Sequence, residues 1–317
     1  MKGVISLTDW DWFQFLRGQP DLDDVNFWRP SDTHRPHLAP GTPFVFKLSQ
    51  KHGGWIVGFG IFASHSVLPM WMAWDAFELK NGAATFAGLH AMLGAVRRRK
   101  SLPADPAGTY EIGCMMLSAP MFFERGDWIR PPADWPRSGI MQGKSYDLLI
   151  GEGARVWEGC QAVALGRGLL TGAPARAGEP ATPRYGEPVL TRPRLGQGTF
   201  RIAVTDAYGR ACAVTTEHSL PVLEAAHIRP FAQDGPHEVS NGLLLRTDIH
   251  RLFDKGYVTV TPDHRFLVSR RLKDEYQNGR TYYAMHGTPI HLPRDPCDYP
   301  DPARLEWHAR ELFRDSA

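Results

Sequence analysis

The sequence of 317 residues contains only four cysteines, and they are widely spaced. Cys114, Cys160, Cys212 and Cys297 lie at least 46 residues apart, so there is no CxxC pair for a zinc ribbon and no sign of a disulfide framework. No apolar run approaches the roughly 18 residues of a membrane span. The first 20 residues carry charges and lack the apolar segment of a secretory signal. We therefore expect a cytoplasmic chain with reduced thiols and no membrane partner.

The net charge is also small, at +2. Residues 1–162 carry 16 basic and 16 acidic side chains, so charge alone does not indicate a nucleic-acid partner. Two ring-bearing residue types, however, are unevenly distributed. Nine of the ten tryptophans fall within residues 1–157, and eight of the 13 histidines fall within residues 195–317. Because the length already favours about two domains, these skews indicate two parts with different chemistry.

Residues 1–162 are rich in short apolar or alternating runs bounded by Gly, Pro and Asn, which is typical of β-strands. Two segments have helical spacing instead: Leu7–Leu16, with Thr8 as its N-cap, and Ala83–Arg98. Many short strands with few helices predict a compact curved sheet or a small barrel. The predicted strands are residues 43–48, 54–64, 110–117 and 144–150.

Residues 163–196 are dominated by Gly, Pro, Ala and Arg and show no apolar periodicity, which predicts an extended linker. A structured surface loop is the alternative, although loops of this length are uncommon inside one domain. Regular patterns return in residues 197–317. The predicted elements there are a helix at 200–209 closed by Gly209, strands at 222–228 and 242–246, a helix at 248–256 with Thr247 as N-cap, and a hairpin at 257–269.

Three side chains of the second part have a notable spacing: His227, Asn241 fourteen residues later, and His250 nine residues after that. They fall at the end of one predicted strand, at the start of the next and on the following helix, so a hairpin packed on a helix would bring them to one cleft. Phosphodiester hydrolysis needs a base to deprotonate water, a fixed orientation for that base and a divalent cation. A neutral imidazole can be the base, the amide can bond to the backbone near it, and the second imidazole can hold the metal.

The segments around these residues resemble the HNH endonucleases of the ββα-metal type. The resemblance covers residues 197–317 and is densest in CAVT (212–215), LEAAHIRP (223–230), NGLLL (241–245) and HRLFDKG (250–256). It implies a nuclease domain with His227 as general base, Asn241 as the structural asparagine and His250 as a metal ligand. The implied cofactor is Mg²⁺ or another divalent ion such as Mn²⁺.

One position departs from the family pattern. Many members have Asp or His directly before the base as a second metal ligand, whereas this sequence has Ala226. Some members hold their ion through a single protein side chain together with water and phosphate oxygens, so the departure is compatible with metal binding. Glu224 and Asp248 are the nearby candidates for a second metal ligand.

Other polar residues of the second part have less specific patterns. The candidates for contacts to phosphate are Arg229, Arg246 and Arg251, with solvated surface positions as the alternative. The histidines that we expect in surface loops are His218, His237 and His264.

The tryptophans of the first part cluster in residues 26–31, 71–77 and 125–137. Their rings can stack on an extruded base while adjacent polar groups read its edge, although such rings can equally form the core of a small barrel. The runs FWRPS, PGTPFVFK, GFGIF and WPRSGIMQGKSYDL resemble the PUA-like superfamily, which includes domains that bind modified bases. The candidates for a base-contacting pocket are Trp28, Trp74 and Tyr146.

Together these patterns predict an α+β protein with an N-terminal PUA-like, mostly-β barrel that reads the base (1–162), a Pro/Arg-rich linker (163–196) and a C-terminal ββα-metal HNH nuclease domain (197–317). We interpret the chain as a metal-dependent DNA endonuclease that resembles modification-dependent restriction enzymes and acts on double-stranded DNA with modified bases. One active site cuts one strand, so cutting both requires a homodimer or sequential nicking. Two alternatives stay open: an HNH nuclease for unmodified DNA, and a nucleic-acid-binding protein with a degenerate nuclease domain, which Ala226 favours.

Overall fold

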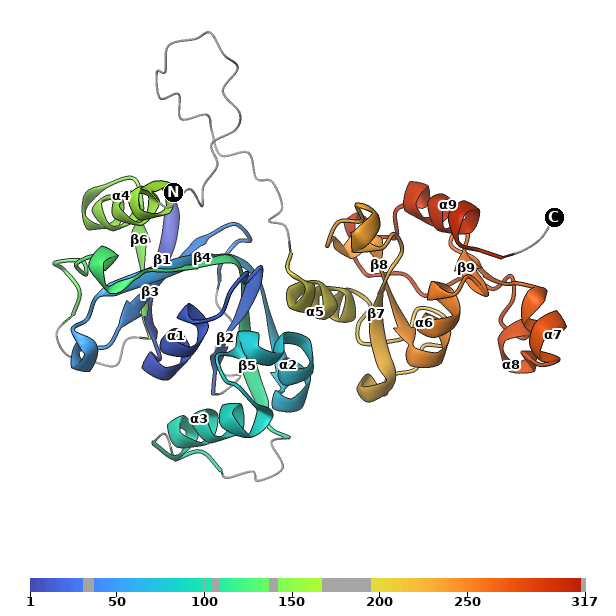
Figure 1. The fold of residues 1–317 in the computed structure, drawn as a ribbon, viewed down its shortest axis with the longest axis horizontal. Coiled ribbons are helices and arrows are strands. Elements are labelled where there is room, and N and C mark those ends of the chain that lie inside the picture. Colours follow the sequence, from blue (N-terminus) through green and yellow to red (C-terminus); the bar gives the residue numbers. More distant parts are fainter. Residues whose placement is uncertain (31–36, 100, 104–108, 137–141, 167–194, 315–317) are drawn as a thin grey trace, which may run out of the picture. The chain divides into compact units, whose positions relative to one another are not determined.

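The computed structural model describes residues 1–30, 37–99, 101–103, 109–136, 142–166 and 195–314. The chain divides into two compact units, Met1–Pro193 and Arg194–Ala317, which are called unit 1 and unit 2 below (Figure 1). Most of the predicted linker at 163–196 lies outside the described residues, and its first residues belong to a helix of unit 1. In the described part of the chain, no helix is both long and apolar enough to cross a membrane.

Unit 1 is built on a six-stranded sheet in which only β1 and β3 run parallel to each other. The strand order is β2-β5-β4-β3-β1-β6. All four strands that the sequence predicts in this part are present, and two further strands, β1 and β2, join them. The bounds are β1 (Lys2–Thr8), β2 (Asp24–Arg29), β3 (Pro43–Leu48), β4 (Ile56–Pro69), β5 (Glu111–Phe122) and β6 (Gly143–Asp147).

Both faces of this sheet are buried. Along β3, Phe46 packs edge-on against Trp12 of α1 at 5.4 Å between ring centroids, whereas Val45 joins the core beneath α4, where Cys160 is buried. The two helices lie on opposite sides of the sheet in Figure 1. A strand covered on both faces needs a mostly apolar sequence, which explains the run PFVF. Lys47, which follows it, is also buried, and its ammonium group donates to the carbonyl of Leu48 at 3.1 Å. The α-helices of unit 1 are α1 (Trp10–Arg17), α2 (Met70–Phe77), α3 (Phe86–Arg99) and α4 (Gly151–Gly166).

The first helix begins later than the sequence predicts. Thr8 is the last residue of β1, and the N-cap of α1 is Asp9, whose carboxylate accepts hydrogen bonds from the backbone N–H groups of Asp11 and Trp12 at 3.0 and 3.1 Å. Aspartate satisfies these otherwise unpaired groups well and also suits the positive end of the helix dipole. The predicted helix at 83–98 is confirmed as α3, with its start shifted by three residues.

The closed barrel expected for unit 1 is not what the described strands form, because β2 and β6 remain as the two edges of an open sheet. Helical segments cover the edge at β2 in place of another strand. The indole N–H of Trp28 donates to the carbonyl of Asn81 at 2.9 Å, and the amide of Asn26 donates to the side chain of Asn81. Asn81 ends the 3-10 helix η2 (Glu78–Asn81), so these bonds fasten η2 to the strand. Because η2 packs against β2, this edge of the sheet does not require a further strand to cover it.

Unit 2 contains two β-hairpins and several helices around one apolar core. Its elements are α5 (Gln197–Ala207), β7 (Leu223–His227), β8 (Gly242–Arg246), α6 (Thr247–Asp254), β9 (Val258–Val260), β10 (Phe266–Val268), α7 (Arg271–Tyr276), α8 (Arg280–Tyr283) and α9 (Pro302–Glu311). Strand β7 pairs antiparallel with β8, and α6 packs on both. This arrangement confirms the predicted strand, strand and helix order, and the predicted hairpin at 257–269 is also present.

Two local features of unit 2 can be compared with the predicted helix ends at Gly209 and Thr247. Gly209 follows α5 with φ of 62°, in the left-handed region that favours glycine, as the predicted helix end requires. Thr247, in contrast, does not cap α6. It is the first residue of that helix, and its hydroxyl donates to the carbonyl of Val222 at 3.0 Å. The threonine therefore ties the start of α6 to the chain that leads into β7.

Helix α4 continues to Gly166, so we predict that unit 1 needs residues up to 166 for full stability. Fragments 1–166 and 195–317 should each unfold cooperatively, whereas fragment 1–162 should be less stable than 1–166 by about 1 kcal/mol, because it lacks Ala164, a fully buried residue of α4. Urea unfolding of the three fragments measures this. Equal stability of 1–162 and 1–166, or an insoluble 195–317, would contradict the division.

Candidate functional site

His227 is the last residue of β7 and is held between aromatic rings. The ring of Phe200, from α5, stacks on it at 4.0 Å between centroids and an angle of 13°. Its Nε2 lies 2.9 Å from Nδ1 of His237, close enough for a hydrogen bond. Burial, followed by the neighbouring His237 and His250, lowers the pKa of His227 to about 4. His227 is therefore neutral at physiological pH, as a general base must be.

A glycine lets α5 approach this histidine. Gly242 lies directly opposite His227 in the β7–β8 ladder. A Cβ at this position would come within 2.4 Å of Val204 and within 3.1 Å of the Phe200 ring, both on α5. Without a side chain at Gly242, the phenyl ring can reach the imidazole across the hairpin. Gly242 therefore has two roles: it is the first residue of β8, and it leaves room for α5 to pack against the site.

Asn241 fixes the chain that follows the base. Its side chain is fully buried and makes three hydrogen bonds to backbone groups. Its Oδ1 accepts from the N–H of Arg229 at 3.0 Å, and its Nδ2 donates to the carbonyls of Arg229 and Pro236 at 3.0 and 2.9 Å. In addition, the N–H of Ile228 donates to the carbonyl of Asn241. Both ends of the loop 228–241 are therefore held together next to His227.

His250, on α6, lies between two carboxylates. Its Nδ1 is 2.7 Å from Oε2 of Glu224, and its Nε2 is 3.4 Å from Oδ2 of Asp254. The structure thus brings together His250 and Glu224 as the sequence analysis proposed. Asp254 is an addition that the sequence analysis missed, although it stands four residues after His250 on one helix and so shares its face.

Asp248 is placed elsewhere, and its carboxylate is engaged with other groups. Arg246 contacts it through two parallel hydrogen bonds at 2.7 and 2.8 Å, and the hydroxyl of Tyr282 donates to it at 3.0 Å. The bonds from Arg246, followed by that from Tyr282, lower the pKa of Asp248 to about 2. The carboxylate and the guanidinium neutralise each other, so the predictions of a metal ligand at Asp248 and a phosphate contact at Arg246 lose their geometric support.

The other two arginine candidates, Arg229 and Arg251, lie in different surroundings. Arg251 lies on the exposed side of α6. Arg229 donates through Nε to the carbonyl of Gln233 at 2.6 Å, and its guanidinium carbon lies 5.5 Å from the centre of the Trp307 ring. It lines a cavity of about 370 Å³ along α9, together with Arg304 and other residues of that helix. Arg229 and Arg251 stay candidates for phosphate contacts.

His237 is a residue of the site that the sequence analysis missed, since we expected only a position in a surface loop. It does lie in a loop, but its ring is turned inward against His227 and is covered by the ring of Phe231, which stacks on it at 4.6 Å. No periodicity marks this residue in the sequence. Its position depends on Asn241, which holds the neighbouring Pro236.

The donors around His250 can be compared with what a divalent cation needs. Among the described residues, no three or more His, Cys, Asp or Glu side chains are grouped so that they could hold a metal ion. His250 with Glu224 or Asp254 nevertheless offers an imidazole and a carboxylate, held in mutual contact. Mg²⁺ commonly takes one or two carboxylates and completes its shell with water and phosphate oxygens. The donor set therefore fits a partly open site and not a closed protein cage.

The three candidates for a base-contacting pocket in unit 1 are not brought together. Trp28 lies on β2 and Tyr146 on β6, at opposite edges of the sheet. Trp28 is buried and its N–H is bonded to Asn81, as in a core residue. The hydroxyl of Tyr146 donates to Asp134 at 3.0 Å. Trp74, on α2, packs edge-on against Phe86. These three rings do not form one pocket.

The environment of His227 predicts how its imidazole titrates. In the metal-free protein its pKa should be near 4, and in His237→Ala it should rise, because the electrostatic interaction with His237 is lost while burial, the larger cause, remains. The value should still lie below the ordinary 6.5. Titration of the imidazole followed by NMR measures both. His218→Ala, which changes an exposed histidine of the same unit, should leave the pKa unaltered. A wild-type pKa of about 6.5 would contradict the burial argument.

Comparisons with known proteins address the same segment. Residues 212–261 match the model of the HNH endonuclease family. No curated protein matches the chain. The chain resembles a solved structure titled "Modification dependent TagI restriction endonuclease", with 14% identity and a TM-score of 0.28 over 94% of this chain and 79% of that chain, a likeness too weak to argue from. The matched segment contains β7, β8 and α6 with the two histidines and the asparagine described above. The chain therefore carries an HNH endonuclease domain at residues 212–261.

Proposed function

We propose that the protein is a metal-dependent DNA endonuclease in which unit 2 hydrolyses the phosphodiester bond and unit 1 selects DNA that carries a modified base. One observation carries the catalytic part of the proposal. A neutral, half-buried imidazole, His227, lies on the same β7–β8–α6 arrangement as a second imidazole flanked by two carboxylates. This combines a general base with donors for a divalent cation within the segment that matches the HNH endonuclease family.

In this proposal His227 accepts a proton from the water molecule that attacks phosphorus. Asn241 acts on the base indirectly, because its hydrogen bonds to Arg229 and Pro236 hold the loop that begins after His227 and presents His237. His237 lies at hydrogen-bonding distance from Nε2 of the base and can take the proton onward toward solvent. Phe200 stacks against the base and keeps its ring plane fixed.

His250 together with Glu224 or Asp254 would hold the divalent cation, with water and phosphate oxygens completing its shell. When bound, the cation neutralises charge that develops on the phosphate and on the leaving oxygen. Asp254 and Glu224 contribute negative charge on either side of one imidazole, which favours a cation at this place. The absence of a carboxylate or histidine at Ala226 is compensated by Glu224, two residues earlier on the same strand.

Support for selection by unit 1 is chemical. Unit 1 contains nine of the ten tryptophans, and residues 1–162 have equal numbers of acidic and basic side chains. Affinity for phosphates through counterion release requires an excess of positive charge, so a balanced domain gains more from stacking on bases. An endonuclease that cuts unmodified DNA equally well is the alternative that the experiments below separate.

Replacing the base tests the catalytic assignment. His227→Ala should reduce Mg²⁺-dependent nicking of a supercoiled plasmid by roughly 100-fold to 10,000-fold, the contribution of a general base. Its affinity for DNA should change little. Nicking is measured on gels with the full chain, and methylated and unmodified plasmids are compared in parallel. Cleavage by His227→Ala at near the wild-type rate would refute the role of this residue, and equal rates on all plasmids would refute selection by unit 1.

A matched pair of carboxylate variants tests the metal site. Glu224→Gln should raise the Mg²⁺ concentration needed for half-maximal nicking by at least about tenfold, because it removes a charged oxygen donor beside His250. Asp248→Asn changes a carboxylate on the same α6 arrangement that is bonded to Arg246, so it should leave the Mg²⁺ requirement nearly unchanged. The reverse result would restore Asp248 as the ligand and exclude Glu224.

A further inference from the structure

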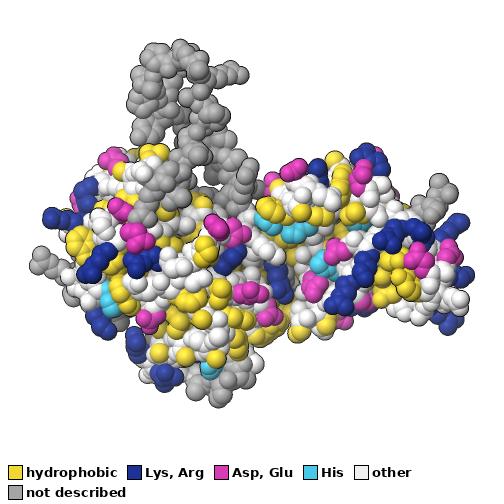
Figure 2. All heavy atoms as spheres, viewed as in Figure 1, with side chains coloured by type: hydrophobic (Ala, Val, Ile, Leu, Met, Phe, Trp, Pro, Cys, Tyr) yellow, Lys and Arg dark blue, Asp and Glu magenta, His cyan; other side chains and the backbone are white. Residues whose placement is uncertain are grey.

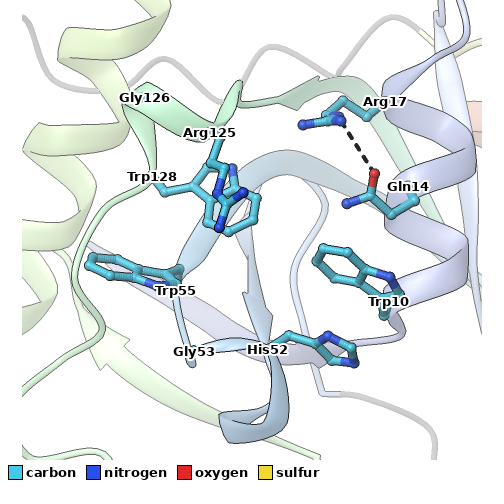
Figure 3. A pocket seen from close by; sticks show the side chains of 9 residues that line it. All are labelled: Trp10, Gln14, Arg17, His52, Gly53, Trp55, Arg125, Gly126 and Trp128. Atoms are coloured by element: carbon cyan, nitrogen blue, oxygen red, sulfur yellow. Dashed lines mark hydrogen bonds between the residues drawn. The ribbon is translucent and has the colours of Figure 1, made fainter.

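Unit 1 has a pocket of about 900 Å³. Its lining does not include Trp28, Trp74 or Tyr146, the earlier candidates for base contact. It opens between α1, the turn after the 3-10 helix η1 (Gln50–His52) and the 3-10 helix η3 (Arg125–Asp127) (Figure 3). Three tryptophans, two arginines and one glutamine supply most of its chemistry: Trp10, Trp55, Trp128, Arg17, Arg125 and Gln14. We call it the tryptophan pocket.

Helix α1 supplies one wall of this pocket by dividing its residues between two faces. Trp10, Gln14 and Arg17 stand at positions i, i+4 and i+7 and therefore share one side of the helix. Trp12, Phe13 and Leu16 are buried in the core of unit 1. The eight-residue helix thus has one face that packs and one that lines the pocket.

A glycine turn positions the opposite wall. Gly53 and Gly54 have φ of 84° and 70°, in the left-handed region. A Cβ at Gly53 would lie 2.6 Å from Nε1 of Trp55, so only glycine lets the indole fold back against the turn. In Figure 3 Trp55 lies across the pocket from Trp10. A third indole, that of Trp128, is held by a hydrogen bond from its N–H to the carbonyl of Phe123 at 3.2 Å.

The rings of the pocket are fixed and only half-buried. Trp10 stacks on His52 at 4.4 Å with an interplanar angle of 3°, and it meets Trp128 edge to face at 6.5 Å. Trp10, Trp55 and Trp128 all remain partly exposed. Large aromatic rings that the core does not fully cover can bind a flat molecule at little cost in side-chain entropy.

Polar groups stand beside these rings. Oε1 of Gln14 accepts a hydrogen bond from Arg17 at 3.3 Å, which leaves its amide nitrogen directed into the pocket (Figure 3). Arg17 also lies 3.6 Å from the carboxylate of Glu124. Arg125 has no ion-pair partner among the described residues, and it lines the pocket (Figure 3). An amide can read the edge of a heterocycle, and a guanidinium can bind phosphate oxygens.

This combination favours a ligand with a planar heterocycle and a phosphate. A purely apolar ligand would offer no partner to the guanidinium of Arg125 or to the amide nitrogen of Gln14. On the face of unit 1 seen in Figure 2, basic and acidic side chains are interspersed, so no broad positive surface accounts for DNA binding there. The tryptophan pocket, in contrast, places aromatic rings on which a base can stack next to positively charged arginine side chains.

We propose that the tryptophan pocket binds one nucleotide extruded from the DNA substrate, with its base on the rings of Trp10 and Trp55 and Arg125 on a flanking phosphate. The inference rests on the proposed function of unit 1 and names the residues that would carry it. Gln14 contacts the edge of the base, where a substituent changes the pattern of hydrogen bonds or the space available. A site of this kind rejects the wrong base because its polar groups are then left unpaired.

Binding by the full chain tests this assignment. The probes are labelled duplexes, identical except for one cytosine that is unmodified, methylated or hydroxymethylated, together with the free monophosphate of each nucleotide. Fluorescence anisotropy in EDTA prevents cleavage. The wild type should bind one modified duplex at least about tenfold more tightly than the unmodified duplex. Trp55→Ala and Trp10→Ala should each weaken that binding by about fivefold to 150-fold, the value of stacking on one base. Trp55→Phe, which keeps a ring, should lose less.

The matched control is Trp74→Ala, which removes a half-exposed tryptophan of the same unit outside the tryptophan pocket and should leave binding unchanged. Selective wild-type binding that persists in both pocket variants overturns the pocket assignment and leaves the proposed function standing. Equal wild-type binding to all duplexes overturns selection by unit 1 and this inference with it, while plasmid nicking still reports the activity of unit 2. Binding of free monophosphates as tight as that of the duplexes overturns the extruded nucleotide in favour of a free nucleotide ligand.

Discussion

The geometry of the nuclease site depends on the side-chain amide of Asn241. An amide can donate and accept at once, and here it does both across one short gap, to the N–H and the carbonyl of Arg229, while its second donor holds Pro236. A carboxylate could not donate, and a hydroxyl could not span both groups. The buried asparagine therefore closes the loop between the two strands. His227 at the end of β7 and His237 within the loop meet because this closure holds.

Two different arrangements of charge lie within a few residues of each other on α6. At Asp248 the carboxylate is matched by an arginine and a tyrosine hydroxyl, which is a neutral structural pair. At His250 two carboxylates flank a single imidazole, so negative charge is in excess. Only the second arrangement has something to gain from a cation. The division follows from strand β8, which ends at Arg246 and places its guanidinium over the first turn of α6.

The sequence identified those features whose signal is local. His227, Asn241 and His250 lie in an apolar context whose strand and helix periods fix their relative positions. Glu224 and Asp248 were named together from the sequence and Asp254 was missed, because the sequence does not show which carboxylate has a partner. In the fold, the bond to Arg246 sets Asp248 apart from the other two. His237 depends on loop closure, which no period encodes. In unit 1 the alternation of the strands was visible, but an indole that fills a core and one that lines a pocket have the same sequence signal.

Helix α1 has a consequence for how unit 1 responds to whatever occupies the tryptophan pocket. Eight residues are too few for a helix to persist alone in water, so its exposed face exists only while Trp12, Phe13 and Leu16 remain packed. Occupancy and folding are therefore linked: a molecule that binds this face binds no unfolded chain, and it raises the melting temperature of unit 1 by mass action. A thermal-shift screen of unit 1 would report ligands of the pocket without any cleavage assay.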